Sequence, residues 1–157
     1  MRKFKLRILY GCFLVLLPHL CNASNNDINS PEAPSRTFIQ NYKDMVLGNC
    51  LAKAYLNGEI ASMDSGSSVS GLEEWTYYDL EESPQAVQHL IEMYLSRNYL
   101  NPLAESEMKG VKFDFLKCLD LYHSKDLDKL AKRMIEHPQD TFRGTIRNYY
   151  RDLNRKK

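Results

Sequence analysis

Two cysteines, Cys50 and Cys118, constrain the fold of this chain more than any other feature. Each lies in a segment whose apolar residues recur with the period of an α-helix, and each is placed on the apolar side of its helix. Cys50 is one turn from Val46, and Cys118 is next to Leu119. Because apolar helix faces pack together in a core, the pattern predicts that the two thiols can meet.

The N-terminus indicates the compartment in which these thiols are found. It begins with a basic stretch (MRKFKLR), continues with an apolar one (ILYGCFLVLLPHL), and offers small residues at Cys21 and Ala23 for cleavage before Ser24. This order is typical of a secretory signal peptide, so we predict an exported protein that loses residues 1–23. A transmembrane anchor is the alternative, but the apolar run is interrupted and shorter than the roughly 18–20 residues that a span requires.

Export changes the expected chemistry of the cysteines. Disulfides persist outside the reducing cytoplasm, so we predict a Cys50–Cys118 bridge. It would close a loop of about 70 residues and stabilise the fold by roughly 4 kcal/mol in the loop-entropy description. The alternatives are two buried free thiols, or a catalytic cysteine paired with His123. A catalytic thiolate requires an exposed, electropositive site, which an apolar helix face does not supply.

Charge is distributed unevenly along the chain. Without the four basic residues of the leader, 17 basic residues stand against 20 acidic ones, a net charge of −3. Residues 24–142 carry 11 basic and 19 acidic side chains, whereas residues 143–157 carry six basic and one acidic. An acidic body argues against nucleic acid as a partner and suits a basic protein. No later apolar run is long enough to span a bilayer, so we predict no stable membrane insertion after cleavage.

Periodicity and capping signals predict a compact all-α fold, a bundle of five or six helices with one intramolecular disulfide. Ser35 is a candidate N-cap for the first helix, Ser83 with Pro84 starts the clearest amphipathic helix, and Ser124 caps the last one. Four of the expected helices cover residues 36–57, 84–98, 111–123 and 125–136. A further helix is expected to begin at about residue 59. The expected divisions are a signal peptide at 1–23, a disordered leader at 24–35, a helical domain at 36–138 and a basic, mobile tail at 139–157.

The segment after the first helix is open to two interpretations. Residues 64–70 are rich in serine and glycine, which is typical of a loop, and SGLE at 70–73 would then be a capping box that starts a helix. A stripe of mostly small residues at helical spacing favours a continuous helix from about residue 59, because small side chains let a neighbouring helix approach closely. The stripe consists of Ala61, Ser65, Ser68, Leu72 and Trp75.

The sequence offers no recognisable catalytic constellation, and we predict neither enzymatic activity nor a metal or cofactor. His89, His123 and His137 lack the zinc-type spacing to one another or to cysteine. The stretch GSSVSG is no nucleophile elbow, because the second glycine of G-x-S-x-G would fall on Ser70.

Two stretches are candidate partner-binding surfaces. The connection at 101–110 (NPLAESEMKG) has no helical stripe, and binding residues concentrate in loops on rigid scaffolds, although a solvated connector that only covers the core is the simpler alternative. Its candidate residues are Leu103, Glu105, Ser106, Glu107, Met108 and Lys109. The second surface is the acidic, tyrosine-containing stretch at 73–82. Its candidates are Glu73, Glu74, Tyr77, Tyr78, Glu81 and Glu82.

Three stretches taken together resemble a known family. They are YKDMVLGNCLAKAY at 42–55, GSSVSGLEEWTYYDLEESP at 66–84 and GVKFDFLKCLDLYHSKDL at 110–127. With the run K-C-L-x-L-Y-H-S and the upstream N-C-L, the chain resembles the periplasmic immunity proteins for type VI secretion peptidoglycan amidases, the family paired with the fourth amidase effector group. The resemblance covers about residues 38–138, and the tail after Phe142 is longer and more basic than expected of that family.

The resemblance implies a periplasmic all-helical protein, usually a homodimer, that binds a cognate papain-like (NlpC/P60-type) cysteine amidase and occludes its active site. The protein itself would be no enzyme. The family's paired cysteines match Cys50 and Cys118, in agreement with the predicted bridge. Ten tyrosines, more aromatic residues than a small core needs, also favour a dimer. An alternative interpretation is a periplasmic adaptor module that binds another envelope partner through its tyrosine-rich surface.

Overall fold

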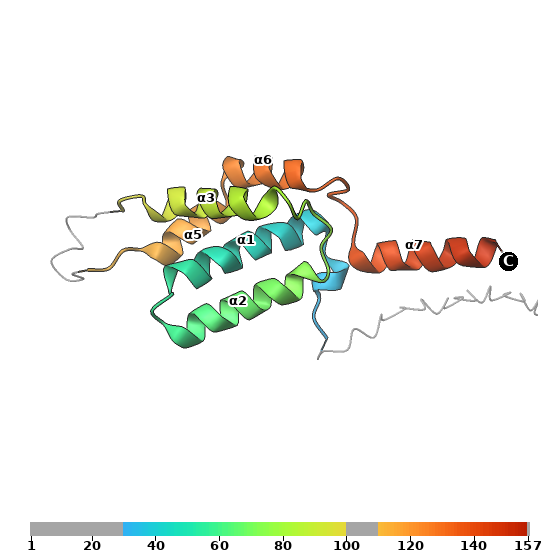
Figure 1. Cartoon of the computed structure of the whole chain (residues 1–157), viewed down its shortest axis with the longest axis horizontal. Helices are drawn as coiled ribbons and strands as arrows, with labels where there is room; N and C mark the ends of the chain where they lie inside the picture. Colours follow the sequence, from blue (N-terminus) through green and yellow to red (C-terminus); the bar gives the residue numbers. More distant parts are fainter. Residues whose placement is uncertain (1–29, 100–109, 157) are drawn as a thin grey trace, which may run out of the picture. The chain divides into compact units, whose positions relative to one another are not determined.

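The computed structural model describes residues 30–99 and 110–156, and within them the chain is helical (Figure 1). The elements are η1 (Ala33–Ser35), α1 (Phe38–Ala54), α2 (Glu59–Glu73), α3 (Ser83–Leu95), α5 (Asp114–Tyr122), α6 (Lys125–Met134) and α7 (Phe142–Arg155). Among the described residues the β pairing is limited to one isolated bridge, between Thr37 and Thr141. The predicted all-α bundle of five or six helices is confirmed.

Helix α1 begins with a capping box at Thr37. The Thr37 hydroxyl accepts the N–H of Gln40 at 3.3 Å, and the Gln40 side-chain oxygen accepts the N–H of Thr37 at 3.0 Å. The prediction that Ser35 caps this helix was wrong, because only Thr37 has a glutamine three residues later to close the box. Ser35 instead ends η1, where Ala33 is buried, so residues 33–35 are ordered and are not part of a disordered leader.

The start of α3 also differs from the expected arrangement. Ser83 was expected to be the N-cap, but it is buried, and its hydroxyl lies 2.7 Å from the hydroxyl of Tyr42 in a hydrogen bond between α3 and α1. The carboxylate of Asp79 accepts the N–H groups of Glu81 and Glu82 at 2.8 and 2.9 Å and so fixes the turn that leads into α3, while no side chain caps the helix itself. The Ser83 hydroxyl therefore joins two core helices, and the acid before α3 orders the turn that precedes it.

Helix α1 is central to the packing, with contacts to α2, α3, α5 and α6 (Figure 1). The predicted disulfide is confirmed: Cys50 of α1 and Cys118 of α5 are fully buried, with their Cα atoms 5.7 Å apart. The rest of the main core consists of Phe38, Tyr42, Val46, Val87, Leu90, Ile91, Tyr94, Leu121, Leu127, Leu130, Ala131, Met134 and Ile135.

Polar contacts fix the ends of the other core helices. Lys117 of α5 is buried, and its ammonium donates to the carbonyl of Leu95 at 3.0 Å and to the carboxylate of Asp114 at 2.9 Å. This buried charge is therefore both paired and hydrogen-bonded to the last residue of α3. Ser124 caps α6 as expected, since its hydroxyl accepts the N–H of Leu127 at 3.0 Å.

The helix expected from residue 59 is confirmed as α2, which lies close to α1 at Gly48. A Cβ atom placed on Gly48 would lie only 2.6 Å from Cγ2 of Val69 in α2. The expected inward stripe was only partly right: Ala61 and Ser68 are exposed, while its other three members are partly buried. The helix is turned so that Val69 fills the space over Gly48, and this directs the neighbouring Ser68 to solvent.

The basic segment 139–157, expected to be a mobile tail, contains α7. Thr141 caps this helix by accepting the N–H of Gly144 at 3.0 Å. The chain before it pairs with the start of α1, because Phe38 donates its N–H to the carbonyl of Asp140 at 2.8 Å. None of the residues of α7 is buried. Within residues 30–99 and 110–156, no helix has the length and apolar character of a membrane span.

Candidate interaction surface

The stretch 73–82, here called the acidic connector, is the end of α2 and the link to α3, and buried hydrogen bonds hold it on the bundle. The side-chain amide of Asn41, which is fully buried, donates to the carbonyl oxygens of Ala33 at 2.9 Å and Trp75 at 3.4 Å. Further along, the N–H of Asp79 donates to the carbonyl of Met134 at 2.9 Å. These contacts satisfy backbone groups of a segment that has no regular structure, so it is held in one conformation.

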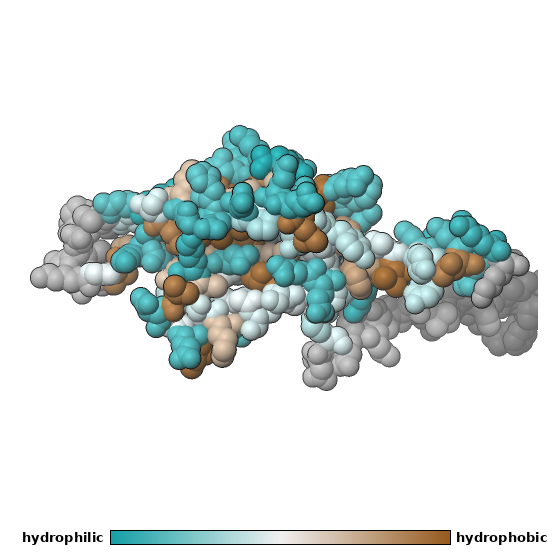
Figure 2. All heavy atoms as spheres, in the orientation of Figure 1, coloured by the Kyte–Doolittle hydropathy of each residue, from teal (hydrophilic) through white to brown (hydrophobic). Residues whose placement is uncertain are grey.

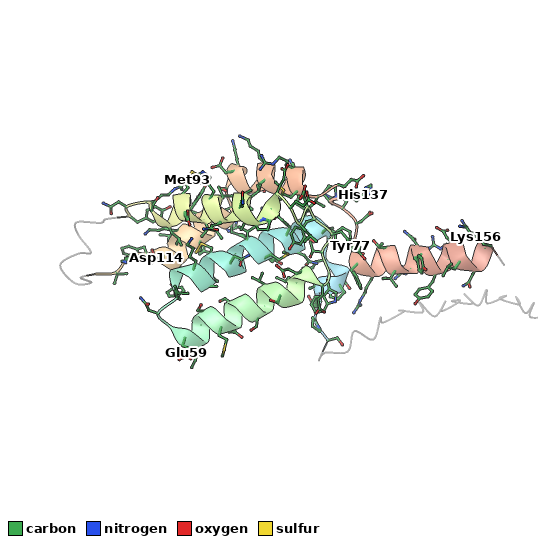
Figure 3. All side chains as sticks on the ribbon, viewed as in Figure 1. Glu59, Tyr77, Met93, Asp114, His137 and Lys156 are labelled. Carbon is green, nitrogen blue, oxygen red and sulfur yellow. A yellow bond between two sulfur atoms is a disulfide. The ribbon has the colours of Figure 1, made fainter. Side chains whose placement is uncertain are left out.

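Tyr77 is the large aromatic residue that the acidic connector presents to solvent. Tyr77 is 55% exposed. Its ring packs edge-on against the ring of Phe38, with centroids 5.3 Å apart, and its centroid lies 6.3 Å from that of Phe142. Figure 3 shows Tyr77 near the junction between the bundle and α7. An aromatic ring that is fixed on one side and exposed on the other loses little conformational freedom on binding, as an interface anchor requires.

Tyr78 points in another direction and connects the acidic connector to α1. Its ring packs edge-on against Tyr42 at 5.5 Å, and its hydroxyl donates to the Glu73 carboxylate at 3.4 Å. Burial, followed by the negative charge of Glu73, raises the pKa of Tyr78 to about 12. The phenol therefore stays protonated at neutral pH and remains a hydrogen-bond donor to the acid.

Carboxylates dominate the charge of the acidic connector. Residues 73–82 contain no lysine, arginine or histidine. All of their acids are exposed: Glu73, Glu74, Asp79, Glu81 and Glu82. A surface of one charge sign attracts partners of the opposite sign and raises the rate at which they meet. The structure therefore brings all six residues of the second predicted surface into one acidic, aromatic region, with Tyr78 turned inward.

Two hollows border this region, and the sequence analysis anticipated neither. A cleft of ≈ 470 Å³ between α1, α2 and α3 is lined by Leu56, Glu73 and Tyr78 among others. A second hollow of ≈ 720 Å³ is lined by Tyr77, Tyr78 and Arg133 among others. The lining residues come from segments far apart in the sequence, so no local pattern could reveal them.

The structure excludes a catalytic cysteine in the region it describes. Cys50 and Cys118 are consumed by their bridge, so the alternative of a thiolate paired with His123 was wrong. His123 is exposed at the C-cap of α5, with its ring 5.1 Å from that of Tyr122. His89 is exposed on α3. No cluster of three or more histidine, cysteine, aspartate or glutamate residues placed to hold a metal occurs among the described residues.

Comparison with known families identifies the bundle. The family model of the type VI secretion system (T6SS) amidase immunity proteins matches residues 40–131, more than half of the chain. The chain belongs to this family. The matched region extends from α1 into α6 and contains the disulfide and the whole acidic connector. Helix α7 lies beyond it.

A solved structure supports this membership of the T6SS amidase immunity family. It comes from work on new type VI-secreted toxins and self-resistance proteins in Serratia marcescens. The two chains are 29% identical with a TM-score of 0.64, and the similarity covers 75% of this chain and 93% of that chain. No curated protein matches the sequence significantly.

The first predicted binding surface of this immunity-family member lies outside the described residues. Residues 103–109, which include every candidate in that connection, fall between the described ranges. The described residue that follows, Gly110, has φ of 82°, a left-handed conformation that glycine adopts without strain. The connection at 101–110 therefore stays a prediction from the sequence.

Proposed function

We propose that this immunity-family member acts in the periplasm, where it binds a type VI secretion peptidoglycan amidase with a papain-like cysteine active site and occludes that site. The protein protects its own cell and sibling cells and performs no catalysis. The observation that carries the proposal is the family match over residues 40–131. The disulfide between Cys50 and Cys118 supports export, because such bridges persist in oxidising compartments.

The acidic connector suits an inhibitory contact for two physical reasons. Its backbone is fixed by Asn41 and by the carbonyl of Met134, so little freedom is lost when a partner binds. Its exposed Tyr77, surrounded by carboxylates, offers an anchor for a pocket and a field that attracts a basic enzyme. We therefore place one part of the amidase contact at residues 73–82.

The connection at 101–110 is the other part of the proposed contact, on sequence grounds. Leu103 and Met108 are apolar residues without a predicted helix face to cover them, and Glu105 and Glu107 are acids that can pair with basic groups near a catalytic cleft. We also propose that the protein is a homodimer, which sedimentation equilibrium at micromolar concentration would test by its mass.

The decisive experiment is co-purification with the product of the neighbouring gene, which the proposal expects to be an amidase, followed by an assay of peptidoglycan peptide cleavage. We expect a stable complex and stoichiometric loss of cleavage. A folded protein that neither binds nor inhibits that amidase contradicts the proposal. A neighbouring gene for an envelope assembly factor, with which the protein forms a complex, would favour the adaptor interpretation.

A pair of variants separates the two proposed contact regions. Replacing residues 103–108 with glycine and serine should abolish inhibition without changing the melting temperature, if this connection enters the active-site cleft. The control replaces residues 60–64 of α2, most of which are exposed, with alanine, which should leave inhibition intact. Full inhibition by the folded 103–108 variant would remove the connection from the contact and leave residues 73–82.

A further inference from the structure

Helix α7 carries an unburied apolar stripe along one face. Ile146, Tyr149, Tyr150 and Leu153 recur at the spacing that places side chains on the same side of an α-helix. They are 38%, 60%, 61% and 42% exposed, and hydrophobic residues are visible along α7 in Figure 2. Phe142, by contrast, packs against the core at the start of the helix. The stripe is therefore available to a partner, while the first residue ties the helix to the bundle.

The polar side of α7 is strongly basic. Four exposed arginines follow one another at intervals of four residues and form a row along the helix: Arg143, Arg147, Arg151 and Arg155. Asp152 is the one acid of the helix. No carboxylate among the described residues forms a salt bridge with this arginine row. Residues 143–157 contain six basic residues and one acid, a net charge of +5.

We propose that α7 is a peripheral membrane anchor that lies on an anionic phospholipid bilayer. A short helix with a charged face, an apolar face and low net hydrophobicity rests in the plane of the headgroups, with its apolar side in the acyl boundary. The arginine row pairs with lipid phosphates, which a guanidinium binds through two parallel hydrogen bonds. This role goes beyond the proposed amidase inhibition and does not depend on it.

The charge distribution of the whole molecule favours a bilayer as the occupant of the stripe. Residues 24–142 carry 11 basic and 19 acidic side chains, a net charge of −8, so an anionic surface attracts α7 and repels the body. That opposition holds α7 on the lipid and keeps the acidic body off it. A second copy also offers acids to the arginine row, but its surface intersperses them with lysines and arginines, whereas an anionic bilayer is uniformly negative.

The side chains of the stripe also fit a headgroup boundary. Tyr149 and Tyr150 have an apolar ring and a polar hydroxyl, which is the combination favoured where one end of a side chain is wet. Their rings pack edge-on with centroids 5.7 Å apart, so the pair forms one broad aromatic surface. The helix of 14 residues is too short to cross a bilayer, so the anchor is peripheral.

The test is flotation of the protein with phospholipid vesicles. The protein is isolated after export, so that any leader has been processed, and is mixed with vesicles of phosphatidylcholine alone or with a third phosphatidylglycerol. We expect binding to the anionic vesicles, weakened by salt. Tyr149→Gln with Leu153→Gln removes half of the stripe, and Arg147→Gln with Arg151→Gln and Arg155→Gln removes most of the row. The row variant should bind on the order of a hundredfold more weakly at low ionic strength.

Two controls make the result specific to α7. Lys125→Gln, Lys129→Gln and Lys132→Gln remove the same charge from exposed positions of α6, and Ile60→Gln with Met63→Gln removes exposed apolar residues of α2. Both should bind vesicles like the unchanged protein. The proposal is overturned if the folded protein binds neither vesicle type, or if both α7 variants bind as before. Self-association that the α7 variants lose, without vesicle binding, would assign the stripe to a second copy.

Discussion

Helices α5 and α2 both pack against α1, but they are held there by different means. α5 has nine residues and buries Lys117, Cys118 and Leu121, and one of these forms the covalent bridge to Cys50. α2 has 15 residues and buries only Val69, which lies over Gly48 of α1. The shorter helix is therefore tied covalently into the core, and the longer one rests on a close backbone approach.

This difference separates stability from surface presentation. A helix that buries one residue leaves most of its side chains to solvent, and α2 exposes Ile60 and Met63. Its C-terminal end leads into the acidic connector, so the weakly buried helix carries the surface that we assign to the amidase. The bridged pair of helices supplies the rigid support on which a fixed surface depends.

Removing the bridge should have the largest effect. Replacing Cys50 and Cys118 with alanine should lower the free energy of unfolding by about 2–5 kcal/mol, because the unfolded chain regains the freedom of a long loop. Urea denaturation of the exported protein and the variant measures this loss. Val69→Ala is the matched change in α2 and should cost less than the bridge.

If Val69→Ala lowers the free energy of unfolding as much as removal of the bridge does, then α2 and α5 contribute equally to stability and the contrast drawn between them is wrong. The bridge itself can be checked by alkylation without reductant and intact-mass analysis of the exported protein, which should show no modified cysteine. Two alkylated thiols in that material would contradict the disulfide.

Filling the space at Gly48 should have the next largest effect. A Cβ atom there would lie 2.6 Å from Cγ2 of Val69, so Gly48→Ala should destabilise the fold by about 1–3 kcal/mol despite the better helix propensity of alanine. In a Val69→Ala background the same change should become neutral or stabilising by up to about 1 kcal/mol. A double-mutant cycle in urea measures the coupling, and equal costs in both backgrounds would show that the close approach is unimportant.

The sequence predicted what local periodicity determines and missed what distant segments determine. The bridge followed from the apolar spacing around Cys50 and Cys118. The hydrogen bond between Ser83 and Tyr42 and the fit of Val69 over Gly48 were missed, because both depend on contacts between separate elements. Helix α7 could have been found, since Thr141 precedes apolar residues at helical spacing, but the basic composition of the segment suggested a mobile tail.

Charge reversal in the acidic connector should affect binding more than stability. Glu81→Lys with Glu82→Lys should slow association with the amidase by roughly tenfold at low salt, because the attracting field is weakened. Glu59→Lys with Asp64→Lys makes the same charge change at the other end of α2 and is the control. Stopped-flow association rates measure the effect, with melting curves recorded alongside. Equal slowing by both pairs would show a general effect of net charge instead of a local contact.

The smallest expected effect concerns Tyr78, which joins the acidic connector to α1. Its pKa is raised to about 12 in the folded protein, whereas an unfolded tyrosine titrates near 10. Between these pH values the unfolded state loses the phenolic proton and the folded state keeps it, so the free energy of unfolding should fall as the pH rises above about 10. Tyr78→Phe should remove this part of the decline.

The two proteins should be compared by urea denaturation at several pH values from 8 upward. At pH 8 the phenol is protonated in both states, so the difference between wild-type protein and Tyr78→Phe reports only the lost hydrogen bond to Glu73. From pH 10 toward 12 that difference should shift in favour of the variant. The shift should be small, because the ring is only partly buried and solvent screens the neighbouring carboxylate. A difference that stays constant across this range would mean that Tyr78 has the same pKa in the folded and unfolded states. In that case neither burial nor the charge of Glu73 would affect its phenol in the folded protein.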